Sequence, residues 1–181
     1  MAVPRDPAAA RAWLDAARAR LAANAEAIRA LGSGLGADQA RWRPAPEAWS
    51  LLEVVNHLVD EEREDFRTRV EHTLRDPAAP WPPIDPQGWV RARDYQSRDL
   101  AASLAAFLRE RRASLEWLDG LAAAPWDASH VHPTAGALRA GDMLEAWIGH
   151  DLLHLRQMNE LQWQYLARDA APGALAYAGG W

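Results

Sequence analysis

Four stretches of this chain repeat apolar residues at the spacing of an α-helix, and no stretch of useful length alternates as a β-strand does. The predicted helices cover about residues 7–31, 50–75, 100–118 and 141–166. Gly32-Ser33-Gly34 closes the first helix, and Ser50 with Glu53 forms a capping box that opens the second. Amphipathic helices of this length bury their apolar stripes most simply against one another. The sequence therefore predicts an all-α fold, a four-helix bundle.

The helices are joined by two long connections. Residues 76–88 carry five prolines and are predicted to be irregular, and residues 122–140 precede the last helix. Ser97 or Asp99 is expected to cap the third helix. Because surface loops often carry binding residues, we expect substrate contacts from both connections and from the helix ends around His57.

Length and composition predict one domain, residues 1–169, followed by a tail rich in Ala and Gly, residues 170–181. The chain has no cysteine, which excludes disulfides, thiolate metal sites and cysteine nucleophiles. All 20 basic residues are arginine, so a lysine Schiff base is excluded as well. The formal charge of −5 argues against nucleic acid as a partner. No apolar run approaches the roughly 18 residues of a membrane span, and the N-terminus resembles no export signal, so a cytoplasmic protein without a membrane partner is expected.

Two of the six histidines share one face of the last predicted helix. His150 and His154 lie four residues apart, which brings their imidazoles close enough to bind one metal ion. Counted from Met143, they lie about 20° on either side of the centre of the apolar face. The pair is predicted to face the core, either as metal ligands or as hydrogen-bonded core histidines.

A catalytic metal site commonly has three protein ligands, so a third residue from another helix is required. His57 is the candidate, although its helical phase places it at the rim of the apolar face rather than at its centre. His72 is interpreted as a surface residue near a helix end. His130 and His132 are expected to be solvated in a loop, with lining of the site's mouth as the alternative.

The residues around these histidines resemble the motifs of the DinB-like (YfiT-like) metal-dependent hydrolases. They are residues 49–53 (WSLLE), 57–63 (HLVDEER) and 149–157 (GHDLLHLRQ), with Trp126-Asp127, His132-Pro133 and Gly136. The resemblance covers nearly the whole chain in order. The sequence departs from the common pattern at Arg139-Ala140, which leaves the cap of the last helix undetermined.

The resemblance implies an up-down-down-up four-helix bundle, commonly dimeric, with one metal ligand from the second helix and two from the fourth. These ligands map onto His57, His150 and His154. Zinc and nickel are the ions that such a site implies first, followed by iron and manganese. Family members with assigned activities include transferases that use the thiols bacillithiol or mycothiol, and a maleylpyruvate isomerase. A small-molecule substrate and a low-molecular-weight thiol are therefore expected.

Two glutamates of the second helix are further candidates. Glu62 falls near the centre of the apolar face, where a carboxylate needs a partner. Arg111 matches a recurring position of the family that the sequence resembles, and we predict an ion pair of Glu62 with Arg111. Glu61 lies one turn from His57 and is the candidate general base or fourth ligand. Its alternative interpretation, which the acidic surroundings favour, is a solvated glutamate.

Three residues of the last helix have supporting roles in this hypothesis. Gln157 and Asp151 could orient a ligand or a bound water, and Trp147 could wall the pocket or simply pack in the core. The leading functional hypothesis is a metal-dependent transferase or hydrolase. A non-catalytic metal-binding or stress-response bundle and a metal-free helical interaction protein are the alternatives.

Overall fold

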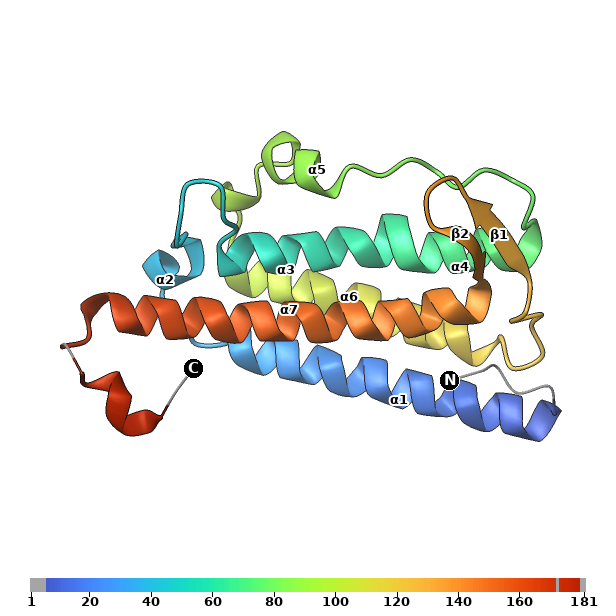
Figure 1. The fold of residues 1–181 in the computed structure, drawn as a ribbon, viewed down its shortest axis with the longest axis horizontal. Helices are drawn as coiled ribbons and strands as arrows, with labels where there is room; N and C mark the ends of the chain where they lie inside the picture. Colours follow the sequence, from blue (N-terminus) through green and yellow to red (C-terminus); the bar gives the residue numbers. More distant parts are fainter. Residues whose placement is uncertain (1–5, 172, 180–181) are drawn as a thin grey trace.

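Four long helical segments form the body of the protein, as predicted. The computed structural model describes residues 6–171 and 173–179. The segments, labelled in Figure 1, are α1 (Pro7–Gly32), α3 (Leu51–Asp60) continued by η1 (Glu61–Asp65) and α4 (Phe66–Arg75), α6 (Leu100–Asp119), and α7 (Ala140–Asp169). The predicted all-α, four-helix class is confirmed.

The second segment is one helix interrupted by a π-helical turn. The backbone N–H of Phe66 donates to the carbonyl of Glu61, five residues earlier, rather than to the residue four positions back. Such a turn takes in one more residue than an α-helical turn and shifts the faces that follow it. η1 begins one turn after His57, so it separates the helical register of His57 from that of the apolar residues in α4.

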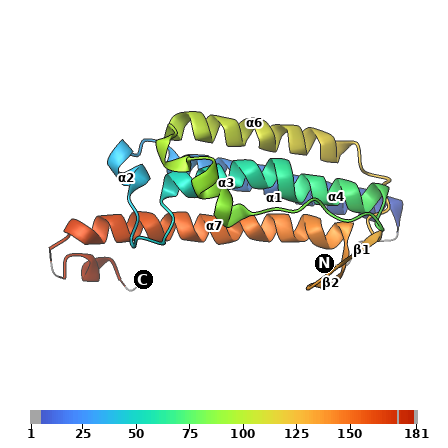
Figure 2. The ribbon, with the colours of Figure 1, turned by 90° about the horizontal axis from the view of Figure 1, so that it is seen from above.

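The packing order places α1 and the α3–α4 segment diagonally across the bundle. α1 contacts α6 and α7, and the α3–α4 segment contacts the same two helices from the other side (Figure 2). Gln162 of α7 bonds the carbonyl of Leu31 and Asn24 bonds Asp151, so α1 and α7 run in the same direction. Arg18 bonds the carbonyl of Leu115 and Arg111 bonds the carbonyl of Leu21, so α6 runs antiparallel to α1.

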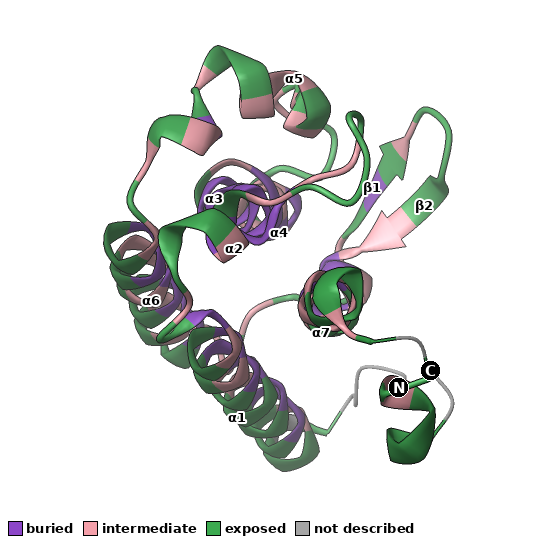
Figure 3. Ribbon diagram, turned by 90° about the vertical axis from the view of Figure 1, so that its left-hand side faces the viewer, coloured by how far each residue is buried: buried purple, intermediate pink, exposed green. Residues whose placement is uncertain are grey.

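Helix α3 is the most enclosed part of the fold. All ten of its residues are buried, including the polar ones. Besides α6 and α7, it contacts α2 (Ala37–Arg41), α5 (Pro86–Ala92) and η2 (Tyr95–Ser97), which close its outer side (Figure 3). A functional residue on α3 is therefore held in the interior, whichever way it points.

The helix ends follow the predicted capping chemistry. Ser50 accepts a hydrogen bond from the N–H of Glu53, whose carboxylate accepts one from the N–H of Ser50 in return. Asp99, rather than Ser97, caps α6. At the undetermined start of α7, Asp142 Oδ2 accepts from the backbone N–H of Arg139 at 2.9 Å.

The connections differ from expectation in two places. α5 begins at Pro86, inside the predicted irregular stretch 76–88, because proline is well tolerated in the first turn of a helix. The connection 122–140 contains an antiparallel hairpin, β1 (Ser129–His132) and β2 (Gly136–Arg139), which the sequence interpretation missed. Strands of four residues are too short to show a clear alternation.

The predicted domain boundary falls at the end of α7, and η3 (Leu175–Ala178) lies beyond it. Residues 1–5 of the predicted domain, and 172, 180 and 181 of the predicted tail, lie outside the described residues. The division into a domain and a tail stays a prediction. Within the described part of the chain, no helix combines the length and the apolar character that crossing a membrane requires.

Candidate metal centre

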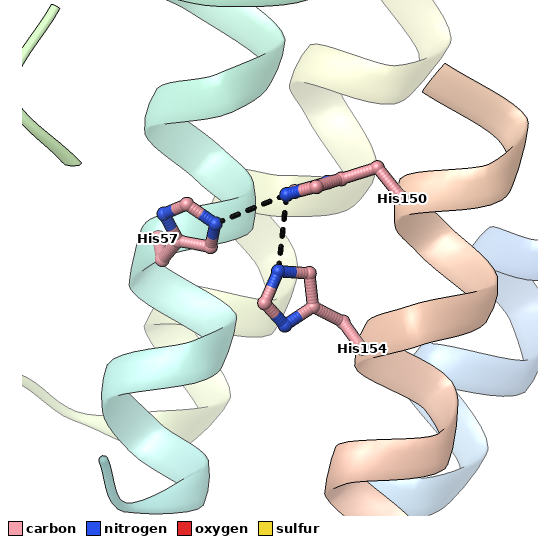
Figure 4. A group of neighbouring side chains, drawn as sticks. All are labelled: His57, His150 and His154. Carbon is pink, nitrogen blue, oxygen red and sulfur yellow. Dashed lines mark hydrogen bonds between the residues drawn. The ribbon is translucent and has the colours of Figure 1, made fainter. Parts of the chain in front are cut away.

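Three histidines from two helices meet between α3 and α7. His57 projects from α3, and His150 and His154 project from successive turns of α7 (Figure 4). The Nε2 atom of His150 lies 3.3 Å from Nε2 of His57 and 3.1 Å from Nε2 of His154. The structure thus brings together all three residues that were predicted as ligands.

The spacing of these nitrogens suits one divalent ion. Zinc binds imidazole nitrogen at about 2.0–2.1 Å, so two ligands at a tetrahedral angle lie about 3.4 Å apart. The observed 3.1 and 3.3 Å are close to this value, and one ligand atom from each histidine lies within 4.8 Å of the others. Nitrogen ligands of this kind are typical for zinc and nickel. The residues present therefore fit the metal that the sequence predicts.

The ring nitrogens facing away from the cluster have partners that would fix the rings. His154 Nδ1 lies 2.8 Å from Oε1 of Gln157, which accepts its hydrogen and leaves Nε2 as the free lone pair. His57 Nδ1 lies 3.5 Å from Oε1 of Glu61, and both atoms are buried without a hydrogen-bond partner. A small movement would bring these two atoms within hydrogen-bond distance. Glu61 could then orient the ring of His57 as Gln157 orients that of His154.

Burial keeps the cluster neutral. Loss of solvent, and then the neighbouring histidines, lower the pKa of His57 to about 2. Burial also lowers the pKa of His150 to about 3 and lowers that of His154. Neutral imidazole is the form that binds metal, so the fold prepares the ligands in the required protonation state.

The depressed pKa of His57 makes the metal-free protein sensitive to acid. Between pH 6.5 and the folded pKa near 2, His57 is protonated in the unfolded chain but not in the folded chain. The free energy of unfolding therefore falls as the pH falls. In the presence of a chelator, urea unfolding at pH 7 and pH 4.5 should show His57→Gln losing roughly 2 kcal/mol less than wild type over this interval. The matched comparison is His72→Gln, which removes an imidazole outside the cluster. Equal acid losses in wild type and His57→Gln would contradict the prediction.

A buried ion-pair network lies next to the cluster. The predicted pair of Glu62 and Arg111 is confirmed, with Arg111 Nη2 2.6 Å from Glu62 Oε1. Asp151 joins it, 2.7 Å from Arg111 Nη1, and each of the three side chains is at most 2% exposed. Trp147 Nε1 donates to Glu62 at 2.7 Å, which shows that this ring packs in the core. Because Asp151 follows His150 directly, the network fixes the α7 turn that carries the ligands.

Two expectations about other titratable residues were wrong. Glu61 is 4% exposed rather than solvated, and burial followed by the carboxylate of Asp65 raises its pKa. His130 is 7% exposed and stacks on Trp81, with ring centroids 4.4 Å apart, because the missed hairpin packs against the connection 76–85. His132 is half-buried on the same strand. Neither hairpin histidine lines the pocket of the three-histidine cluster.

A pocket of about 550 Å³ opens onto His57 and His154. Pro86 and Gln87 come from the predicted proline-rich connection, but the connection 122–140 contributes no lining residue. The sequence interpretation missed the rest of the wall, which consists of Pro44, Glu47, Ala48, Trp49, Glu160, Leu161 and Gln164, in addition to the predicted Gln157. Glu160, Leu161 and Gln164 follow His154 and Gln157 at helical intervals of three to four residues. This helical repeat was the signal that could have found them.

Comparison with known proteins agrees with this geometry. The sequence profile of the DinB superfamily matches residues 20–158, a span that contains all three histidines. The chain belongs to the DinB superfamily. The structure of this chain is similar to that of YfiT from Bacillus subtilis, with a TM-score of 0.75 and 19% sequence identity. The match covers 84% of this chain and 87% of that chain. YfiT is described as a probable metal-dependent hydrolase with an unusual four-helix bundle topology. No curated protein matches this DinB chain at a significant level.

Proposed function

We propose that this protein is a metal-dependent enzyme that activates a thiol or a water at His57, His150 and His154. The observation that carries the proposal is the convergence of three neutral imidazoles, two of which, His57 and His154, line a pocket of about 550 Å³. One divalent ion, zinc or nickel, would supply the positive charge that lowers the pKa of a thiol or a water, because three neutral ligands leave its charge uncompensated.

The chain's own residues prepare this chemistry. His57, His150 and His154 would hold the ion, and the enclosed position of α3 shields the side of the site that faces the core from bulk water. Gln157 holds His154 in one tautomer. Trp49, whose ring centroid lies 4.9 Å from that of His57, offers an apolar face to a substrate beside the reacting atoms.

Glu61, first predicted as a general base or fourth ligand, is proposed to act mainly through His57. Its Oε1 faces Nδ1, the nitrogen of His57 that points away from His150. Glu61→Gln should weaken zinc binding by about 10- to 100-fold, the usual effect of losing a carboxylate that orients a ligand histidine. Competition with a chromophoric chelator measures this, and Glu64→Gln, at a partly exposed carboxylate three residues further along the helix that pairs with Arg93, is the control. Unchanged affinity with lost turnover would instead favour the general base.

Thiol transfer and hydrolysis are separated by assay. The family resemblance favours a thiol-dependent S-transferase, and the description of YfiT favours a hydrolase. Zinc- or nickel-loaded protein should be offered bacillithiol or mycothiol with an electrophile such as a chlorodinitrobenzene, and separately an activated ester. Turnover that disappears in a His150→Ala, His154→Ala double variant supports the enzyme. Metal binding that raises the melting temperature without any turnover would support the alternative, a non-catalytic metal-binding bundle.

A homodimer is also proposed. Leu152 and Leu153 are neighbours on α7 and remain 49% and 55% exposed, which is unusual for adjacent leucines on a bundle helix. Light scattering coupled to size exclusion measures the assembly. A Leu152→Glu, Leu153→Glu variant that stays folded should then be monomeric.

A further inference from the structure

The pocket above the three histidines has a one-sided charge. Glu47 and Glu160 both line it and both are exposed. Among the described residues that form its wall, none is arginine, although arginine supplies all 20 basic residues of the chain. The remaining polar groups are the imidazoles and the side-chain amides of Gln87, Gln157 and Gln164. A ligand in this pocket would therefore contact the negative charges of Glu47 and Glu160 at the wall. The positive charge of a bound metal would act only at the histidines.

Three arginines lie near the wall in sequence, Arg43, Arg91 and the exposed Arg156, and none of them lines the pocket. Arg43 pairs with Glu53, a fully buried carboxylate, through both Nε and Nη2. Arg91 lines a neighbouring hollow that shares Glu47 and Trp49 but contains neither His57 nor His154. Neither guanidinium lines the pocket of the histidines.

Glu160 lies further along α7 than His150 and His154. Glu160 follows His154 by six residues along α7, which corresponds to a rise of about 9 Å. Gln164 donates a hydrogen bond to Glu160 Oε1 at 3.0 Å, which holds the carboxylate on this face of the helix. Trp49, which lines the wall with its ring centroid 4.9 Å from that of His57, adds an aromatic face, a surface that attracts cations.

We infer that the substrate or cosubstrate of this site carries a cationic amine at the end that faces Glu47 and Glu160, away from the atom that the metal would bind, and no carboxylate at that position. Glu47 and Glu160 are the specificity-determining residues, and Trp49 borders the path between them and the metal. This inference rests on the proposed function, because it assigns the substrate class of the same site. It disfavours substrates that present several carboxylates to the pocket wall.

Three thiols of equal length test the inference. 6-Amino-1-hexanethiol, 6-mercapto-1-hexanol and 6-mercaptohexanoate present the same sulfur and differ only in the charge at the far end. Each is titrated into cobalt(II)-loaded protein, and binding is followed by the thiolate-to-cobalt charge-transfer absorbance. The aminothiol should bind about tenfold more tightly than the carboxylate thiol, with the alcohol between them. The preference should shrink as salt is added.

Matched variants identify the groups responsible. A Glu47→Gln, Glu160→Gln variant should reduce the tenfold preference to about twofold or less, whereas Glu26→Gln, an exposed residue of α1 outside the pocket, should leave it unchanged. Equal binding of the three thiols, or tighter binding of the carboxylate, would overturn the inference while leaving the metal site standing. Failure of cobalt to bind at all would overturn the proposed function, and the inference with it.

Discussion

Replacing Arg111 by methionine should lower the free energy of unfolding by about 3–5 kcal/mol. Arg111 is 2% exposed and donates to Glu62, Asp151 and the carbonyl of Leu21. Methionine fills much of the volume but leaves the carboxylates of Glu62 and Asp151 buried without a positive charge. Burying such unpaired charges strongly destabilises the folded state. Urea unfolding at pH 7, followed by circular dichroism, measures the loss.

Two further variants separate charge from packing. Arg29→Met breaks an exposed pair with Glu26 and should cost at most about 1 kcal/mol. Adding Glu62→Gln and Asp151→Asn to Arg111→Met should recover part of the loss, because the unpaired charges are removed with their partner. If Arg111→Met costs no more than Arg29→Met, the network does not hold the helices as described.

Removing the two α7 histidines should abolish metal binding. In a His150→Ala, His154→Ala variant only His57 remains of the three converging imidazoles. Losing one orienting partner of a ligand already costs about 10- to 100-fold in affinity, so losing two ligands should exceed 100-fold. Competition for zinc or nickel with a chromophoric chelator measures the difference.

The matched control removes two other histidines. His130→Ala, His132→Ala deletes the same number of imidazoles from the hairpin, outside the pocket. It should retain wild-type affinity for the metal. If the hairpin variant loses the metal and the α7 variant keeps it, the assignment of the site to His57, His150 and His154 fails.

The helices and part of the site could be predicted because they depend on local sequence. Helical spacing and the Ser50 capping box define where the helices run. The four-residue spacing of His150 and His154 places their imidazoles on the same face of one helix. The energetic cost of an unpaired buried carboxylate indicated that Glu62 needs a partner, and the family resemblance pointed to Arg111 as that partner.

The remainder depends on tertiary contacts that no local pattern contains. His57 looked like a rim residue because its helix was assumed to have a solvated side, whereas all ten residues of α3 are buried. Glu61 looked solvated because acidic runs usually are, whereas α3 and η1 receive arginines from other segments. One example is Arg93, which pairs with buried Asp60 at 2.8 Å from beyond the proline-rich connection.

The pocket wall was missed for a related reason. Glu47 and Trp49 precede α3 in a loop, and only the folded chain shows that this loop faces Glu160 of α7 across the pocket. Pattern analysis assigns faces to helices but gives no position to such a loop. The residues of the pocket wall are thus the part of the site that required the structure.

The central claim, that His57, His150 and His154 together hold one divalent ion, is tested most directly by anomalous diffraction. Crystals of untagged protein prepared with zinc should be measured above and below the zinc absorption edge. The account predicts one anomalous peak about 2.0–2.1 Å from Nε2 of each of the three histidines. Absence of a peak there, with the imidazoles hydrogen-bonded to one another instead, would contradict it.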